Sequence, residues 1–305
     1  MKKIAVILVI AILMASVGFA INILMPVGPT VISMASILSN NVETQVPVNI
    51  SFWKNMDQIT SDIVSKKADI LLLPVSFGAT LYAKGYNIKL AAVTLWKGFY
   101  ILGRKNIDSL KEIKEIYTPQ GKGQTADVMI RYLMSQEGLV EGKDYTIKYA
   151  APPTILALFA SKKIDYTLLP EPYVSLVLYK VKDAKIVMSM YDLWAKRVTG
   201  NIPITGVFVT ENALKDHPLE VGEALSAIKS SVTFAENYPD KAVELSLPYL
   251  KGLPKNVILE SMKRMAFNFK YVYTINKIVA NYIKIMGKIN PVVKEKKDFE
   301  GFYAK

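Results

Sequence analysis

KKADILLLP at residues 66–74 recurs as KKIDYTLLP at residues 162–170. Six of the nine positions are identical: both lysines, the aspartate, two leucines and the closing proline. Each copy reads as a polar segment that leads into a short, largely apolar run, which is typical of a buried strand bounded by a turn signal. The pattern therefore predicts two strands in equivalent positions.

A second pair of matching segments lies upstream of these strands. Pro26-Val27-Gly28 and Pro119-Gln120-Gly121 each precede a helical pattern. A repeat with a spacing of about 95 residues is too long for one unit of a solenoid. It predicts two similar α/β lobes that face each other across a cleft. Chance similarity between two amphipathic segments is the alternative explanation.

Residues 1–20 have the features of a secretory signal peptide. Two lysines precede an apolar run from Ile4 to Val17, and the small residues Gly18 and Ala20 follow. The run is shorter than the roughly 20 residues of a membrane-spanning helix. We predict cleavage before Ile21 and export to a bacterial periplasm. An uncleaved membrane anchor is the alternative.

The chain has no cysteine. We therefore expect no lipid anchor, because lipidation of an exported protein needs a cysteine at the cleavage site. Disulfides, thiolate chemistry and iron–sulfur clusters are excluded for the same reason. Hydrophobic residues make up 51% of the 305 residues, which indicates a folded core rather than disorder.

The formal net charge is +12, and residues 251–305 hold much of the excess, with 12 Lys and Arg against 4 Asp and Glu. In a cytosolic protein this would suggest nucleic-acid binding, but the expected export argues against it. Lys277, Lys284 and Lys288 alternate with apolar residues at helical spacing. They are predicted to form a solvated helix face; contact with an acidic partner and attraction of an anionic ligand are the alternatives.

Strand and helix patterns alternate through the first two thirds of the chain. This order predicts a mostly parallel sheet in each lobe. The strands are expected at 21–25, 46–53, 69–73, 115–118, 145–149, 165–169 and 186–190, and the helices at 31–38, 59–66, 76–84, 125–136, 154–161 and 174–179. The long run 90–103 suits a segment that leaves one lobe and enters the next.

Residues 200–209 are predicted to form the return crossing. Beyond them the pattern is helical, at 219–237, 240–249, 255–270 and 275–286. We expect these helices to pack on the first lobe, which would then be discontinuous. The predicted domains are residues 21–95 with 206–305 for the first lobe and residues 96–205 for the second.

Loops at the carboxyl ends of parallel strands are the expected ligand contacts. Two of them lead directly into helices: Gly28-Pro29-Thr30 and the glycine-rich segment 121–125. Exposed N–H groups at a helix start favour oxyanions, so the two ends could bind a small anion or a polar head group. An ordinary capped helix start is the alternative for each. Segment 121–125 lacks the spacing of a nucleotide-binding P-loop.

Aromatic residues also follow the predicted strands: Trp53, Phe77, Trp96 and Tyr173. Each is either part of the core or a platform for a ligand. Glu171 precedes Pro172 in the second copy of the repeat. It either caps the following helix or accepts a hydrogen bond from a ligand, which would hint at a ligand with a donor group.

Catalytic motifs are missing from the sequence. His217 is the only histidine, so no triad and no histidine-rich metal site can be built. Asp69 and Asp165 begin strands, far from the strand ends that bind ligands, and are expected to be structural. We predict no enzymatic activity, no metal and no cofactor.

Several stretches together resemble one family, the solute-binding proteins of bacterial ABC importers in the branch that serves nitrate, sulfonates, taurine and thiamine-precursor pyrimidines. The matching stretches are the signal peptide, 121–138, Pro152-Pro153, KKIDYTLLPEPYVS and 209–245. The chain departs from the family pattern at Leu110-Lys111-Glu112-Ile113, where Leu-x-Gly-Lys is usual. The stretches cover most of the mature chain, but none of them specifies a ligand.

The resemblance implies a two-lobed, type II periplasmic binding fold that closes on a small solute by hinge motion and is recognised by a membrane permease. A monomer that binds no nucleic acid is expected. Trp96 and Thr205 would lie near the two crossings. The implied ligand contacts are Gly28, Pro29, Thr30, Trp53, Ser76, Phe77, Trp96, Gly123, Gln124, Thr125, Glu171, Tyr173 and Thr205.

Two other functions remain open. Enzymes that form a pyrimidine or dehydrate a small acid share this fold, although they act in the cytoplasm. An exported ligand sensor is the third reading. The ligand is equally open: the helix starts favour an oxyanion such as a sulfonate or nitrate, whereas Glu171 and the aromatic residues favour a flat heterocycle such as a pyrimidine or flavin.

Overall fold

The structure is a computed structural model, and it describes residues 19–42, 44–119, 121–198 and 200–304. The predicted signal peptide therefore lies almost wholly outside the described residues. Within those ranges, no helix is both long enough and apolar enough to cross a membrane.

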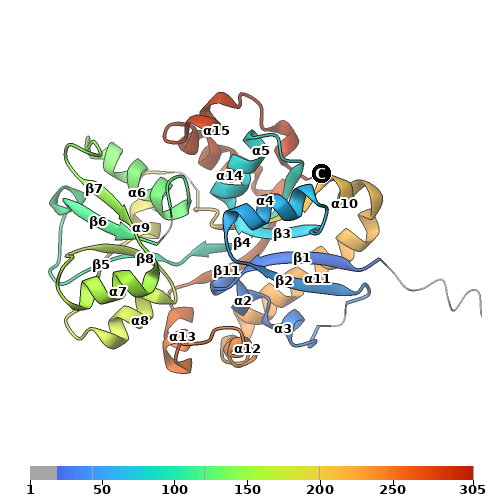
Figure 1. Cartoon of the computed structure of the whole chain (residues 1–305), viewed down its shortest axis with the longest axis horizontal. Coiled ribbons are helices and arrows are strands. Elements are labelled where there is room, and N and C mark those ends of the chain that lie inside the picture. Colours follow the sequence, from blue (N-terminus) through green and yellow to red (C-terminus); the bar gives the residue numbers. More distant parts are fainter. Residues whose placement is uncertain (1–18, 43, 120, 199, 305) are drawn as a thin grey trace, which may run out of the picture.

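Among the described residues, eleven strands form two separate sheets, which lie on opposite sides of the molecule in Figure 1. The first sheet has the order β11 (Ala266–Tyr271), β4 (Ile88–Lys97), β10 (Thr205–Thr210), β3 (Ile70–Pro74), β1 (Ile21–Pro26), β2 (Val48–Trp53). The second has the order β7 (Thr146–Tyr149), β6 (Glu115–Thr118), β8 (Thr167–Pro170), β5 (Phe99–Gly103), β9 (Lys185–Ser189). The predicted α/β class, with two sheets flanked by helices, is confirmed.

Helices cover both sheets (Figure 1). Those before the return crossing are α2 (Pro29–Ser33), α3 (Ala35–Leu38), α4 (Met56–Val64), α5 (Val75–Ala83), α6 (Thr125–Gln136), α7 (Pro152–Ala160), α8 (Tyr173–Lys180) and α9 (Met190–Ala195). Those after it are α10 (Glu211–Asp216), α11 (Pro218–Asn237), α12 (Pro239–Ser246), α13 (Lys255–Met262), α14 (Val272–Gly287) and α15 (Pro291–Glu295). Short 3₁₀ turns lie at Leu110–Glu112 and Glu300–Phe302.

The sheets are mixed, which corrects the prediction of mostly parallel pairing. In the first sheet β1 pairs in parallel with β2 and β3, but β10 is antiparallel to β3 and β4, and β11 is antiparallel to β4. In the second, β6 is parallel to β7 and β8, and β5 is antiparallel to β8 and β9. The antiparallel strands β5 and β10 enter their sheets straight from a crossing, which reverses their direction.

The run predicted at 90–103 is divided by Gly98 into two strands of different sheets. Gly98 has a φ of 152°, which an L side chain rarely adopts. Its carbonyl accepts a hydrogen bond of 2.8 Å from the Glu171 N–H. The glycine therefore separates one extended segment into a strand of each sheet.

The predicted helix 255–270 is wrong in its second half. Helix α13 ends at Met262, and residues 266–271 form β11, which pairs with β4. The sequence AFNFKY is rich in aromatic residues, which suit strands, and the edge of β4 offers unpaired backbone groups. Helix α13 also contacts α8, beside the second sheet, so the C-terminal helices do not pack on the first sheet alone.

The repeated lysines end a helix in the same way in both halves. Lys66 and Lys162 have φ values of 54° and 60°, in the left-handed region. The N–H of the next lysine then reaches back five residues, from Lys67 to the Asp62 carbonyl and from Lys163 to the Leu158 carbonyl, each at 2.9 Å. This is the Schellman helix stop. The chain then continues into β3 in the first half and β8 in the second, and both strands lie inside their sheets.

Glycine at the left-handed positions should stabilise the protein. An L side chain in this conformation costs about 1–2 kcal/mol, partly offset by the greater freedom of glycine when unfolded. We expect Lys66→Gly and Lys162→Gly each to raise the free energy of unfolding by about 0.5–1 kcal/mol in urea denaturation. The matched changes Lys67→Gly and Lys163→Gly should lower it; equal effects at both positions would contradict the assignment.

Candidate functional site

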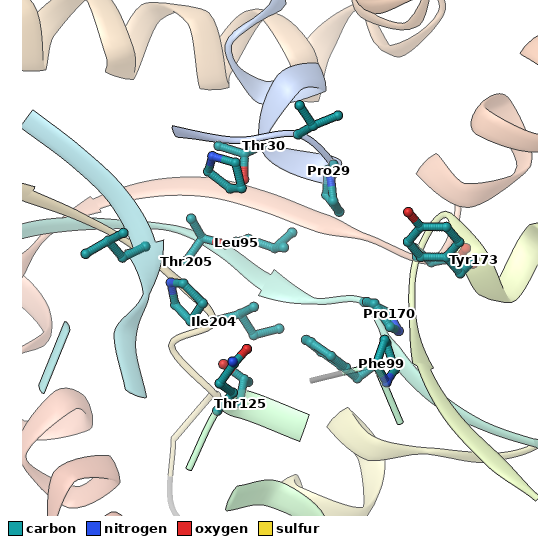
Figure 2. A pocket seen from close by; sticks show the side chains of 18 of the residues that line it. Pro29, Thr30, Leu95, Phe99, Thr125, Pro170, Tyr173, Ile204 and Thr205 are labelled. Atoms are coloured by element: carbon teal, nitrogen blue, oxygen red, sulfur yellow. The ribbon is translucent and has the colours of Figure 1, made fainter. Parts of the chain in front are cut away.

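A cavity of about 520 Å³ lies between the two sheets, within the usual size range of small-molecule sites. Its walls come from the ends of β1, β3 and β8, from the two crossings and from the first residues of α2, α6 and α8. In Figure 2, Tyr173 lies across the cavity from Thr125 and Thr205. The site is therefore built where the carboxyl ends of strands from both sheets meet.

One wall follows β1. Gly28 has a φ of 152° and a ψ of −148°, a backbone conformation that favours glycine. Pro29 and Thr30 then open α2, and the Thr30 side chain is buried. Trp53 stands at the end of the neighbouring strand β2, where its indole N–H donates to the Leu72 carbonyl at 3.3 Å. These residues form a rigid, largely apolar surface.

The opposite wall begins at α6, where Gln124 is the cap residue and Thr125 the first helical residue. The loop before it is fixed by Asp127, a fully buried carboxylate. Asp127 accepts the Gly123 N–H at 2.7 Å, the Arg131 Nε at 2.6 Å and the Tyr149 hydroxyl at 2.6 Å. Asp127 thus fixes the loop that places Gln124 and Thr125 at the cavity. The Gly123 N–H is already bonded to Asp127 and is not free to bind a ligand.

A buried hydroxyl contact connects the two halves beside the cavity. The hydroxyls of Ser76, on α5, and Thr125, on α6, lie 3.3 Å apart. Burial raises the pKa of the Tyr282 phenol, and Ser76 and Thr125 act against that rise. Two helices from distant parts of the sequence, α5 and α6, therefore meet at Thr125.

Glu171 serves as a helix cap and an ion-pair partner. Its buried carboxylate accepts the Ser175 N–H at 3.0 Å, the Ser175 hydroxyl at 2.8 Å and the Arg264 Nε at 2.5 Å. The Arg264 carbonyl in turn accepts the Tyr100 hydroxyl at 2.7 Å. Burial raises the pKa of Glu171, while Arg264 and Ser175 oppose the rise. Arg264 was not predicted, because it falls in the segment 255–270, which was expected to be a helix packed on the first lobe.

Most of the predicted contact residues line this cavity: Gly28, Pro29, Thr30, Trp53, Gln124, Thr125, Glu171, Tyr173 and Thr205. Four do not: Ser76, Phe77, Trp96 and Gly123. Trp96 is buried, and its indole N–H donates to the Asn268 carbonyl of β11 at 2.7 Å. That contact depends on a strand that the sequence did not reveal.

Further lining residues were not predicted, and most are apolar. The strand ends contribute several prolines, a consequence of the strand–proline–helix pattern that the repeat already displays. The additional residues include Pro74, Pro119, Pro170, Leu95, Phe99, Ile204 and Met265, several of which are labelled in Figure 2.

Charge is scarce in the cavity. Of the described lining residues, only Lys54 and Glu171 carry a formal charge, and Glu171 is neutralised by Arg264. The described part of the chain contains no group of three or more His, Cys, Asp or Glu residues placed to hold a metal ion. The arrangement is suited to enclosing an apolar or aromatic molecule and to offering it a few hydrogen bonds from threonine and glutamine.

Replacing Arg264 by methionine should leave Glu171 buried without its partner. Removing one member of a buried ion pair costs about 3–5 kcal/mol, so we expect a loss of that size in the free energy of unfolding at neutral pH. Without Arg264 the pKa of Glu171 rises further. A carboxyl whose pKa is higher in the folded state destabilises the fold as pH rises through that pKa, so the deficit should shrink towards pH 4.5.

Urea denaturation between pH 4.5 and 8 measures this effect. The double variant Glu171→Gln/Arg264→Met should lack the pH dependence, because it has no buried charge. Lys263→Met, at the exposed neighbouring position, should change stability little. A deficit in Arg264→Met that is the same at every pH would contradict a charged Glu171–Arg264 pair.

The comparisons with known proteins agree with this architecture. The model of the NMT1-like family matches residues 88–246, just over half of the chain. No sequence among curated proteins matches significantly.

Solved structures share the fold at low sequence identity. An ABC transporter protein from Parabacteroides distasonis is 23% identical, with a TM-score of 0.76 over 94% of this chain and 99% of that one. The periplasmic aliphatic sulphonate-binding protein SsuA from Escherichia coli is 17% identical, with a TM-score of 0.76 over 94% and 92%. The periplasmic nitrate-binding protein NrtA from Synechocystis is 13% identical, with a TM-score of 0.64 over 81% and 70%. The predicted two-lobed fold is thereby confirmed.

Proposed function

The chain belongs to the NMT1-like family, and on that premise we propose that it is the extracytoplasmic solute-binding component of an ABC importer. It captures a small solute between two lobes and presents it to a membrane permease. Two proteins with this fold support the proposal: SsuA binds aliphatic sulphonates, and NrtA binds nitrate. The proposed lobes are residues 21–95 with 206–305, and residues 96–205.

The observation that carries the proposal is the position of the cavity. It lies between the sheets, and both contribute strand ends to its walls. A solute held there touches both lobes at once, so its binding energy favours whichever arrangement brings the walls together. The solute-bound protein then has a closed conformation, which a permease can distinguish from the open one.

The crossings supply the hinge in this proposal. The β4–β5 connection lies at Gly98, and residues 200–204 lead into β10. Hinges are short segments at the ends of elements that absorb changes in φ and ψ. Gly98 and Thr205 also line the cavity, so the solute and the hinge are in direct contact.

We propose an aromatic heterocycle with hydrogen-bonding edges as the solute, rather than a bare oxyanion. The walls carry Trp53, Phe99 and Tyr173, together with apolar side chains and prolines. A buried anion without a matching cation is costly, and Lys54, the one lining cation among the described residues, is solvent-exposed. A flat ring needs no such charge and gains from contact with aromatic faces.

Tyr173 should make a direct contribution to binding. Tyr173→Ala removes a large aromatic wall, so we expect the affinity for an aromatic solute to fall by about 2 kcal/mol, or roughly 30-fold. Isothermal titration calorimetry with a pyrimidine or flavin that raises the melting temperature measures it. Tyr179→Ala, on the same helix but 60% exposed, should leave affinity unchanged; equal losses in both variants would remove Tyr173 from the site.

Native mass spectrometry of the purified mature protein tests the function itself. A small molecule that is retained under native conditions and released unchanged on denaturation would identify the solute. If the protein is empty, a thermal-shift panel of pyrimidines, flavins, sulfonates and nitrate follows. Chemical conversion of the bound molecule would overturn capture without reaction, and a shift with sulfonates or nitrate alone would overturn the heterocycle.

A further inference from the structure

A second hollow opens beside the main cavity. Its volume is about 330 Å³, and it lies between α7 and α8 on one side and residues 250–253, which follow α12, on the other. Its side walls are mainly apolar, from Leu156 and Leu176 of the helices and Leu253 of the loop. It is therefore bounded by two helices beside the second sheet and by a loop that follows α12.

The two hollows share part of their walls. Val27, Gly28, Pro152 and Tyr173 line both of them. Gly28 has no side chain, and the space that a Cβ atom would occupy there is open, with no other atom within 4 Å. Gly28 and Tyr173 thus border both spaces, and the two hollows lie side by side.

The second hollow differs from the first in charge. Its described lining residues include Lys180, at the end of α8, and Lys251, in the facing loop, but no carboxylate. Both lysines are exposed, and neither belongs to an ion pair among the described residues. Two exposed cations at an apolar hollow, with no ion-pair partner among the described residues, favour a negatively charged group there.

We propose that the hollow formed by α7, α8 and residues 250–253 is a second compartment of the solute site. It takes the aliphatic arm of an elongated solute, whose ring lies in the main cavity and whose anionic end meets Lys180 and Lys251. This inference rests on the proposed function. It defines the solute class as an aromatic head, an apolar arm and a terminal carboxylate, sulfonate or phosphate.

A homologous series of probes tests the second compartment. The probes are ω-phenylalkanoates with one, three, five and seven methylene groups, titrated calorimetrically into the mature protein. A buried methylene strengthens binding by about fourfold. We expect little change in affinity while the chain stays within the main cavity, then a gain of about 16-fold for each two methylenes that enter the second compartment.

Two variants, on opposite walls of the second compartment, should remove the gain in affinity with chain length. Leu156→Trp and Leu253→Trp each narrow the second compartment without altering the main cavity, and each should flatten the dependence on chain length while preserving affinity for the shortest probe that binds. Both positions are partly exposed, so the larger side chain can be accommodated in the fold. Circular dichroism checks that it is.

The charge of the arm is tested separately. The double variant Lys180→Glu/Lys251→Glu should bind the longest probe at least tenfold more weakly at low salt and the shortest probe with unchanged affinity. The affinity for the corresponding uncharged ω-phenylalkanols should be the same in this variant as in the unchanged protein. Lys143→Glu/Lys215→Glu changes the net charge equally at exposed positions outside the two hollows and should have no effect.

The outcomes separate the two proposals. Affinity that does not depend on chain length, or that depends on it equally in the tryptophan variants, would overturn the second compartment but leave solute capture intact. A hollow that instead serves as a docking surface for the permease would give that result. Failure of every probe to bind, together with no bound molecule and no thermal shift in the panel, would overturn solute capture and the second compartment with it.

Discussion

One extended segment, broken only at Gly98, pairs with β10 and β11 in the first sheet and with β8 and β9 in the second. Both sheets therefore contain part of the same backbone segment. The ends of the strands that neighbour it in the two sheets lie on opposite sides of the cavity. The cavity is a consequence of this arrangement, since the side chains that follow those strands have to share the space between the sheets. The Glu171–Arg264 pair adds a second connection at the same place, because Arg264 comes from the segment leading into β11.

The two sheets have the same inner plan. In the first sheet, β1 pairs in parallel with β2 and β3, and β3 also pairs with the antiparallel strand β10. In the second, β6 pairs in parallel with β7 and β8, and β8 also pairs with the antiparallel strand β5. The doubled KKxD…LLP pattern accompanies that plan. In both halves the first lysine ends a helix in a Schellman stop, and the leucines belong to a central strand that ends at the proline. The repeat therefore located the strand-end loops correctly, including Gly28 and Tyr173.

The features that the sequence did not predict depend on contacts with distant segments of the chain. Trp96 reads as a strand-end aromatic, but it is buried because β11 packs over it, and AFNFKY alone does not reveal whether an edge is available to pair with. Arg264 is one of several basic residues in the C-terminal segment, and only the folded chain distinguishes it by placing it against a buried carboxylate. The antiparallel strands were missed for the same reason, since alternating strands and helices predict parallel pairing and carry no signal for the reversal at a crossing.

The position of β10 also constrains the order in which the halves form. β3 and β4 follow each other closely in the sequence but do not pair, because β10 lies between them, and its residues 205–210 come more than 100 residues later. The second sheet uses only residues 99–189. Because the chain is made from its N-terminus, the second sheet has all its strands before β10 exists. The edges of β3 and β4 that β10 occupies therefore stay unpaired until the second half is complete.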